Sequence, residues 1–109
     1  MFSLDEALKE IMDAARESKI VREEGEVNII YASAAKMRFY LIDGSFVDVF
    51  VNVEKDKWYY FWLRVDGSEY KVNNFPRHGW HEHRAGKRIP IKPMSPKGFF
   101  AKVRNEIRP

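Results

Sequence analysis

The stretch KMRFYLIDGSFVDVFVNV, residues 36–53, carries the strongest local signal for the fold. Asp43-Gly44 stands between two runs in which the side chains alternate in character. An Asp-Gly pair in this setting favours a tight turn, because the backbone there needs a positive φ that glycine adopts without steric cost. We therefore predict a β-hairpin with strands at residues 36–42 and 45–53.

Three further strands are predicted on the two sides of this hairpin. Residues 26–32 are rich in β-branched side chains and follow a charged stretch, residues 22–25, that we interpret as a loop. Residues 58–65 and 68–72 flank a second Asp-Gly turn at Asp66-Gly67. These segments together predict an antiparallel β-meander of four to five strands.

Helices are predicted at both ends of the chain. Ser3 and Glu6 fit the S-x-x-E capping box, in which each side chain accepts a hydrogen bond from the backbone N–H of the other residue. Apolar residues then recur at helical spacing, which predicts an amphipathic helix over residues 3–18. Ser95-Pro96 supplies an N-cap followed by proline at the first helical position and predicts a closing helix over residues 95–107.

Residues 73–94, between the sheet and the closing helix, contain prolines and glycines that break any periodicity. Irregular segments longer than about 12–15 residues in a compact domain are usually functional or disordered. The 109 residues are thus predicted to form one α+β domain. Its antiparallel sheet lies within residues 26–72, and one helix precedes the sheet and another follows it in the sequence.

The composition excludes several classes of protein. The chain has no cysteine, which excludes disulfide scaffolds, zinc–thiolate sites and cysteine nucleophiles, and it has no apolar run long enough to span a membrane. Acidic residues stand near the N-terminus where a signal peptide is basic and then apolar, so we expect a cytoplasmic protein without a membrane partner. The absence of Gln and Thr, with 32% charged residues, is typical of a heat-adapted organism, a thermophile.

Charge is distributed unevenly along the chain. Residues 1–54 contain 6 Lys and Arg against 11 Asp and Glu, a net charge of −5, whereas residues 55–109 contain 13 against 5, a net charge of +8. A basic half of this kind indicates either a polyanionic partner such as nucleic acid or a solvated basic surface without a ligand. Charge alone leaves both interpretations open.

The predicted strand at residues 58–65 is unusually aromatic. Alternation places Trp58, Tyr60 and Trp62 on one face of the sheet and Tyr59, Phe61 and Leu63 on the other. Both faces pack in the core, or one face packs and the other offers an aromatic surface on which the bases of a single-stranded nucleic acid stack. Core packing against helices is the commoner role of such side chains.

All three histidines of the chain, His78, His81 and His83, lie in the predicted loop. Imidazole exchanges a proton near neutral pH, and nearby cations lower its pKa by repulsion between like charges. Four cations of this loop neighbour the histidines: Arg77, Arg84, Lys87 and Arg88. Imidazoles and guanidinium groups are the parts that metal-independent RNA cleavage needs, because the reaction uses a base, an acid and cations that stabilise the phosphorane.

Three other roles of the histidines stay open. The pattern His-x-x-His-x-His could ligate a divalent metal with Glu82 as a further ligand or hydrogen-bond acceptor. The imidazoles could instead be structural, packing beside Phe75 and Trp80. They could also contact phosphates beside the arginines without doing chemistry.

The order of these segments resembles the TumE family of toxin–antitoxin toxins over about residues 18–88. The hairpin strands around Asp43-Gly44-Ser45 are similar to that family's strand–DGS–strand element, and residues 58–62 and 66–71 to its aromatic strand and its DG-x-x-Y-R/K segment. Residues 73–78, followed by His81 and His83, resemble its two histidine elements, here nearly merged, with Asn73 where the family tends to have Asp. The resemblance implies a growth-inhibiting toxin that acts on RNA and is neutralised by a cognate helix-turn-helix antitoxin.

The leading hypothesis is therefore a toxin-like, metal-independent endoribonuclease that needs no cofactor and has RNA and an antitoxin as partners. Its acid and base candidates are His78, His81 and His83. The residues expected to bind nucleic acid are Arg77, Arg84, Lys87, Arg88 and Lys71. The alternative is a non-enzymatic module that binds nucleic acid or the antitoxin, and self-association as a homodimer stays open.

Overall fold

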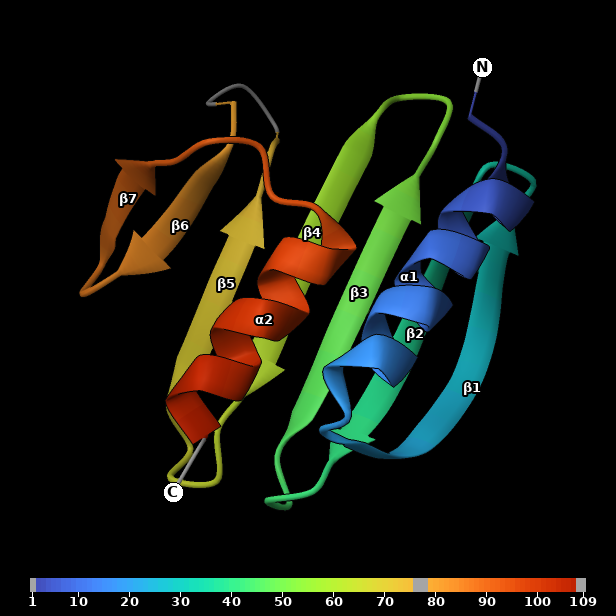
Figure 1. The fold of residues 1–109 in the computed structure, drawn as a ribbon. Coiled ribbons are helices and arrows are strands. Elements are labelled where there is room, and N and C mark those ends of the chain that lie inside the picture. The colour runs from blue at the N-terminus through green and yellow to red at the C-terminus, as the bar shows by residue number, and fades with distance from the viewer. Residues whose placement is uncertain (1, 76–78, 108–109) are drawn as a thin grey trace.

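The computed structural model describes residues 2–75 and 79–107 and consists of a seven-stranded antiparallel sheet with two helices (Figure 1). In chain order the elements are α1 (Leu4–Ser18), β1 (Val21–Tyr31), β2 (Ala34–Leu41), β3 (Phe46–Asn52), β4 (Lys57–Leu63), β5 (Glu69–Asn73), β6 (His81–Arg84), β7 (Lys87–Pro90) and α2 (Pro96–Ile107). Each strand pairs with the next one along the chain, so the sheet is a meander with β1 and β7 at its edges.

Both predicted helices are confirmed, together with the N-caps that begin them. The Ser3 hydroxyl accepts a hydrogen bond from the backbone N–H of Glu6 at 3.1 Å, and the Glu6 carboxylate accepts one from the N–H of Ser3 at 2.9 Å. These two bonds lower the pKa of Glu6. At α2, the Ser95 hydroxyl accepts a hydrogen bond from the N–H of Gly98 at 3.0 Å. Within the described chain, neither helix is long and apolar enough to cross a membrane.

The central hairpin is also confirmed, as β2 and β3. Met37 lies opposite Val49 and Phe39 opposite Val47, and all four side chains are buried in the core. Gly44 has a φ of +93° in the connecting turn, where a side chain would be strained. The Asp43 carboxylate accepts a hydrogen bond from the N–H of Ser45 at 2.9 Å, which closes the turn.

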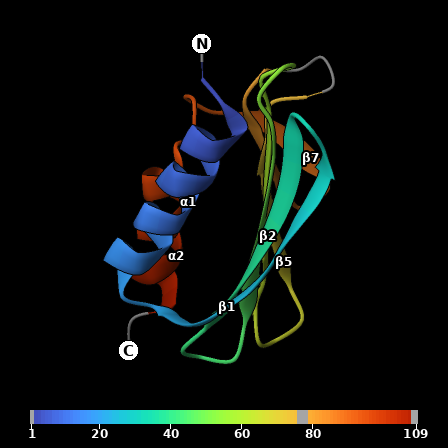
Figure 2. The same cartoon turned by 90° about the vertical axis from the view of Figure 1, so that its right-hand side faces the viewer.

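The two helices cover the same face of the sheet (Figure 2). The core lies between these layers and is largely aromatic: the Phe39 and Phe100 ring centroids are 5.5 Å apart, and those of Tyr60 and Phe99 are 4.8 Å apart. The buried polar atoms of this layer have partners. The Trp62 indole N–H donates to the Ser45 hydroxyl at 3.0 Å, and the Tyr60 hydroxyl donates to the Met94 carbonyl at 3.0 Å. We call the opposite face, which carries no helix, the open face.

The sheet is larger than the four to five strands that we expected. Residues 73–94 were interpreted as an irregular loop, but His81–Arg84 and Lys87–Pro90 form the hairpin β6–β7, which extends the sheet beyond β5. The hairpin turns at Ala85-Gly86, where φ is +51° and +77°, as a tight two-residue turn requires. Short polar strands lack the apolar alternation that predicts a strand, and pairing with the β5 edge stabilises them instead.

Residues 22–25 were also wrongly interpreted as a loop, because they belong to β1. Their charged side chains are accommodated because β1 is an edge strand and most of it is exposed. The pairing of β1 with β2 shifts register between Glu24 and Val27, where β1 passes close over β2. A Cβ atom at Gly25 would lie 2.9 Å from the carbonyl oxygen of Arg38, so this close approach requires glycine.

We expect Gly25→Ala to lower the free energy of unfolding by about 1–3 kcal/mol, because the added methyl group meets backbone and β1 has to shift. Urea unfolding followed by circular dichroism measures the change. Asn28→Ala, an exposed position on the same strand, is the matched control and should stay within about 0.5 kcal/mol of the parent protein. Equal stability of the two variants would contradict the requirement for glycine.

Candidate functional site

The open face carries a continuous row of side chains that crosses six strands. Directly paired residues of neighbouring antiparallel strands point to the same face. Starting from β2, the row is Arg38, Asp48, Phe61, Lys71, His83 and Arg88, each paired with the next. A parallel row is Lys36, Phe50, Tyr59, Asn73, His81 and Pro90. The sheet thus brings charged, aromatic and imidazole side chains together on a face without a helix.

The two interpretations of the aromatic strand β4 are now distinguished. Tyr60 and Trp62 are buried beneath the helices, and Trp58 packs against the same core. Tyr59, Phe61 and Leu63 point to the open face and are only half-buried. One face of β4 therefore packs in the core and the other is an aromatic surface.

His81 and His83 lie side by side on the open face, with ring centroids 5.0 Å apart. Nδ1 of His81 is 2.8 Å from the carbonyl oxygen of Gly79, and because a carbonyl only accepts, this nitrogen carries the proton. The His81 residue is only 2% exposed. His81 therefore holds the chain before β6 in place, and it presents little surface to a ligand.

His83 is more accessible and has the properties of a base. Burial lowers the pKa of His83 from its ordinary 6.5, and the positive charges of His81, Lys71 and Arg88 lower it further. Nδ2 of Asn73 lies 3.4 Å from Nε2 of His83, and an amide nitrogen only donates, so this contact suits the neutral ring. The lowered pKa thus favours the neutral form of His83 at pH 7, and in this contact the lone pair of the ring is on Nε2, facing the Asn73 amide.

The cations that we expected to bind nucleic acid are divided between the two faces. Lys71 and Arg88 flank His83 on the open face, where Lys71 also forms an ion pair with Glu69 at 3.2 Å. Arg84 follows His83 and Lys87 precedes Arg88, and the two residues oppose each other next to the turn. Because neighbouring residues of a strand alternate in direction, both side chains point to the other face of the sheet. Two of the expected cations thus lie with the imidazoles, and two lie across the sheet.

Arg84 has a structural partner on that other face. Its guanidinium group lies 2.9 Å from the Glu82 carboxylate, which also accepts a hydrogen bond from the Tyr70 hydroxyl at 2.7 Å. Glu82 is buried on this face, so the sheet separates its carboxylate from the imidazoles of His81 and His83. The metal site that we considered would have needed these groups on one face. Among residues 2–75 and 79–107, no group of three potential ligands could hold a metal ion. His78 and Arg77, which complete the expected site, lie outside the described residues.

A second charged cluster on the open face was missed in the sequence. Asp48 is buried and accepts two hydrogen bonds from the Arg38 guanidinium group, at 2.7 and 3.0 Å. Lys36 lies 3.4 Å from the same carboxylate, and the guanidinium carbon of Arg38 lies 3.9 Å from the centroid of the Phe46 ring. The carboxylate raises the pKa of Arg38. The alternation of polar residues in β2 was the signal that could have revealed these cations.

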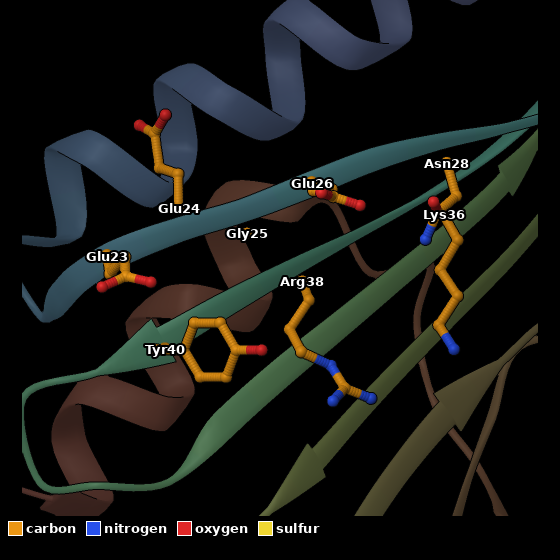
Figure 3. Close-up of a pocket in the computed structure, with 8 residues that line it drawn as sticks. All are labelled: Glu23, Glu24, Gly25, Glu26, Asn28, Lys36, Arg38 and Tyr40. Carbon is orange, nitrogen blue, oxygen red and sulfur yellow. The ribbon is translucent and has the colours of Figure 1, made fainter.

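The open face becomes acidic toward β1. A hollow of 530 Å³ between β1 and β2 brings Glu23 and Glu26 near Lys36, Arg38 and Tyr40 (Figure 3). The side chain of Glu24 turns toward α1, where it pairs with Arg16 at 2.8 Å. These carboxylates would repel an anionic ligand, so the part of the open face that suits an anion lies from β2 to β7.

We expect an NMR titration of the imidazole resonances to give a pKa of His83 below 6.5. Lys71→Gln should raise this pKa, because removing a positive charge makes protonation easier. Lys87→Gln removes the same charge from the other face of the sheet and should leave the pKa unchanged. An equal shift in both variants would show that net charge, and not placement on the open face, controls the titration.

No family model, no curated protein and no solved structure matches this chain.

Proposed function

We propose that this protein binds RNA through its open face and is an endoribonuclease of the toxin type, with His83 as the general base. One observation carries the proposal: the imidazole of His83, whose pKa is lowered, lies between Lys71 and Arg88 in a single row on a face without a helix. Cations bind the phosphates of a polyanion, and a neutral imidazole accepts a proton from its sugar.

The chemistry requires three groups, and the described residues supply two of them. The ribose 2′-hydroxyl replaces the Asn73 amide at Nε2 of His83, which takes its proton. The 2′-oxygen attacks the neighbouring phosphorus while the bond to the 5′-oxygen breaks, leaving a 2′,3′-cyclic phosphate. Lys71 and Arg88 stabilise the negative charge that develops on the phosphorane. The departing 5′-oxygen takes a proton from an acid, the role that we assign to His78, while the buried His81 positions the chain around His83.

The resemblance to the TumE toxins supports the biological part of the proposal. It implies growth inhibition upon expression and release from inhibition by a helix-turn-helix antitoxin. An RNA-directed site agrees with this role, because RNA cleavage stops growth without any further partner.

A second candidate function is RNA binding without cleavage. The burial of His81, which is only 2% exposed, favours it, because a buried imidazole cannot reach a substrate. In this case His83, Lys71 and Arg88 would only contact phosphates. Cleavage measurements separate the two functions, whereas binding measurements test what they share.

We expect Lys71→Gln or Arg88→Gln to weaken binding of a single-stranded RNA and to reduce the slope of log affinity against log salt by about 0.7 for each lost phosphate contact. Fluorescence anisotropy at several salt concentrations measures both quantities. The matched control is Lys87→Gln, which removes the same charge from the same hairpin but from the other face. An equal loss in this control would mean that RNA does not bind to the open face.

We expect His83→Asn to lower the rate of RNA cleavage by about 10²–10⁴-fold, the usual contribution of a general base, with little change in RNA affinity. The rate for the parent protein should fall as the pH drops through the lowered pKa of His83, because the protonated ring cannot accept a proton. Gel analysis of end-labelled RNA, over a pH series, measures both effects. RNA that binds and stays intact would exclude the endoribonuclease and leave the binding function.

A further inference from the structure

We propose that an aromatic pocket on the open face binds one unpaired nucleobase and thereby restricts the RNA ligand to single strands. The pocket is a hollow of 460 Å³ formed by Phe50, Tyr59, Phe61 and Phe75, with Lys36 and Asp48 at its polar side. This proposal rests on the proposed function only in taking RNA as the ligand, and it does not depend on cleavage.

The shape of the pocket suits a flat ring. The Phe75 ring centroid lies 6.5 Å from that of Phe50 and 6.3 Å from that of Tyr59, and the ring planes are inclined by 60° and 46°. At these distances the inclined rings touch one another, so together they form an aromatic wall of the hollow against which a flat base can lie. The four aromatic side chains remain only partly buried, although the helix-covered face of the same strands has a closed core.

The charges around the pocket indicate an anionic ligand with an aromatic part. Lys57 lies with its ammonium nitrogen 5.4 Å from the centroid of the Phe75 ring, and Lys36 lies beside the pocket. Arg38 and Lys36 neutralise the one carboxylate of the pocket, that of Asp48. A nucleotide uses both features, since its base stacks on the rings and its phosphate is attracted by the cations. An apolar side chain of a partner protein would use only the rings.

The distance from the pocket to His83 is short enough for one RNA strand to contact both. Phe61 pairs with Lys71, which pairs with His83, so two strand spacings, about 10 Å, separate the pocket from the imidazole along the row. A base in the pocket would therefore direct its backbone toward Lys71 and His83. A base within a duplex cannot enter the pocket without leaving its stack, which costs a few kcal/mol.

The test compares three RNA probes: a single-stranded octamer, the same octamer with abasic sites, and a blunt duplex. We expect the octamer to bind most tightly. Phe61→Leu keeps an apolar side chain but removes the stacking ring, and it should weaken octamer binding by about 5–150-fold, with little effect on the duplex. The control is Tyr40→Leu, which removes a ring from the same face at the other hollow and not from the pocket. It should change octamer binding by less than about threefold.

A measurement on the unmodified protein keeps the proposal testable if Phe61→Leu destabilises the fold. An octamer that contains 2-aminopurine should lose fluorescence upon binding, because stacking on aromatic rings quenches the base. Equal affinity for the intact and the abasic octamer, or fluorescence that stays unchanged at saturation, would overturn the proposal. If Lys71→Gln weakens RNA binding in that case, the RNA function stands without the pocket. If none of the three probes binds, both proposals fail.

Discussion

The one-sided packing of the sheet is the constraint on which the other features of this protein depend. Helices α1 and α2 bury one face around Tyr60, Trp62 and Phe99, and the hydrophobic burial of these rings stabilises the fold. Successive residues of a strand point to opposite faces. When a side chain of a strand packs in this core, the next side chain along the strand therefore points to the open face. The core residues Val49, Tyr60 and Val72 alternate in this way with Asp48, Phe61 and Lys71.

The electrostatics of the open face connect binding and chemistry. Lys71 and Arg88 place positive charge on both sides of His83, where the proposed function has the phosphate bind. Burial lowers the pKa of His83, and these charges lower it further, which favours the neutral ring. The two parts of the proposed function, binding of a phosphate and acceptance of a proton by His83, would thus depend on the same positive charges. At the opposite end of the sheet, Glu23 and Glu26 reverse the sign of the field. The face is therefore graded from acidic at β1 to basic at β5–β7, so the RNA strand that we propose would lie toward β5–β7.

The local elements of the fold could be predicted from short stretches, and the elements that depend on pairing could not. The Ser3 capping box and the Asp43-Gly44 turn act over a few residues, so their sequence patterns are sufficient. The hairpin β6–β7 has no apolar alternation of its own and forms because the edge of β5 offers backbone partners. For the same reason, the candidate site was predicted only in part. The cluster of imidazoles and cations is visible in the sequence, but not its division between two faces at His83 and Arg84.

The sequence by itself determined the two helices, the central hairpin, the aromatic strand β4, the basic second half and the gathering of the histidines. Each of these is a property of composition or of local spacing. Only the tertiary structure decided that both helices lie on one face, that Lys71 and Arg88 join His83 on the open face, and that Arg84 lies with Glu82 on the other face. The physical reason is that alternation assigns side chains to two faces without saying which face is covered. Strand register and helix docking make that choice through contacts between residues far apart in the chain.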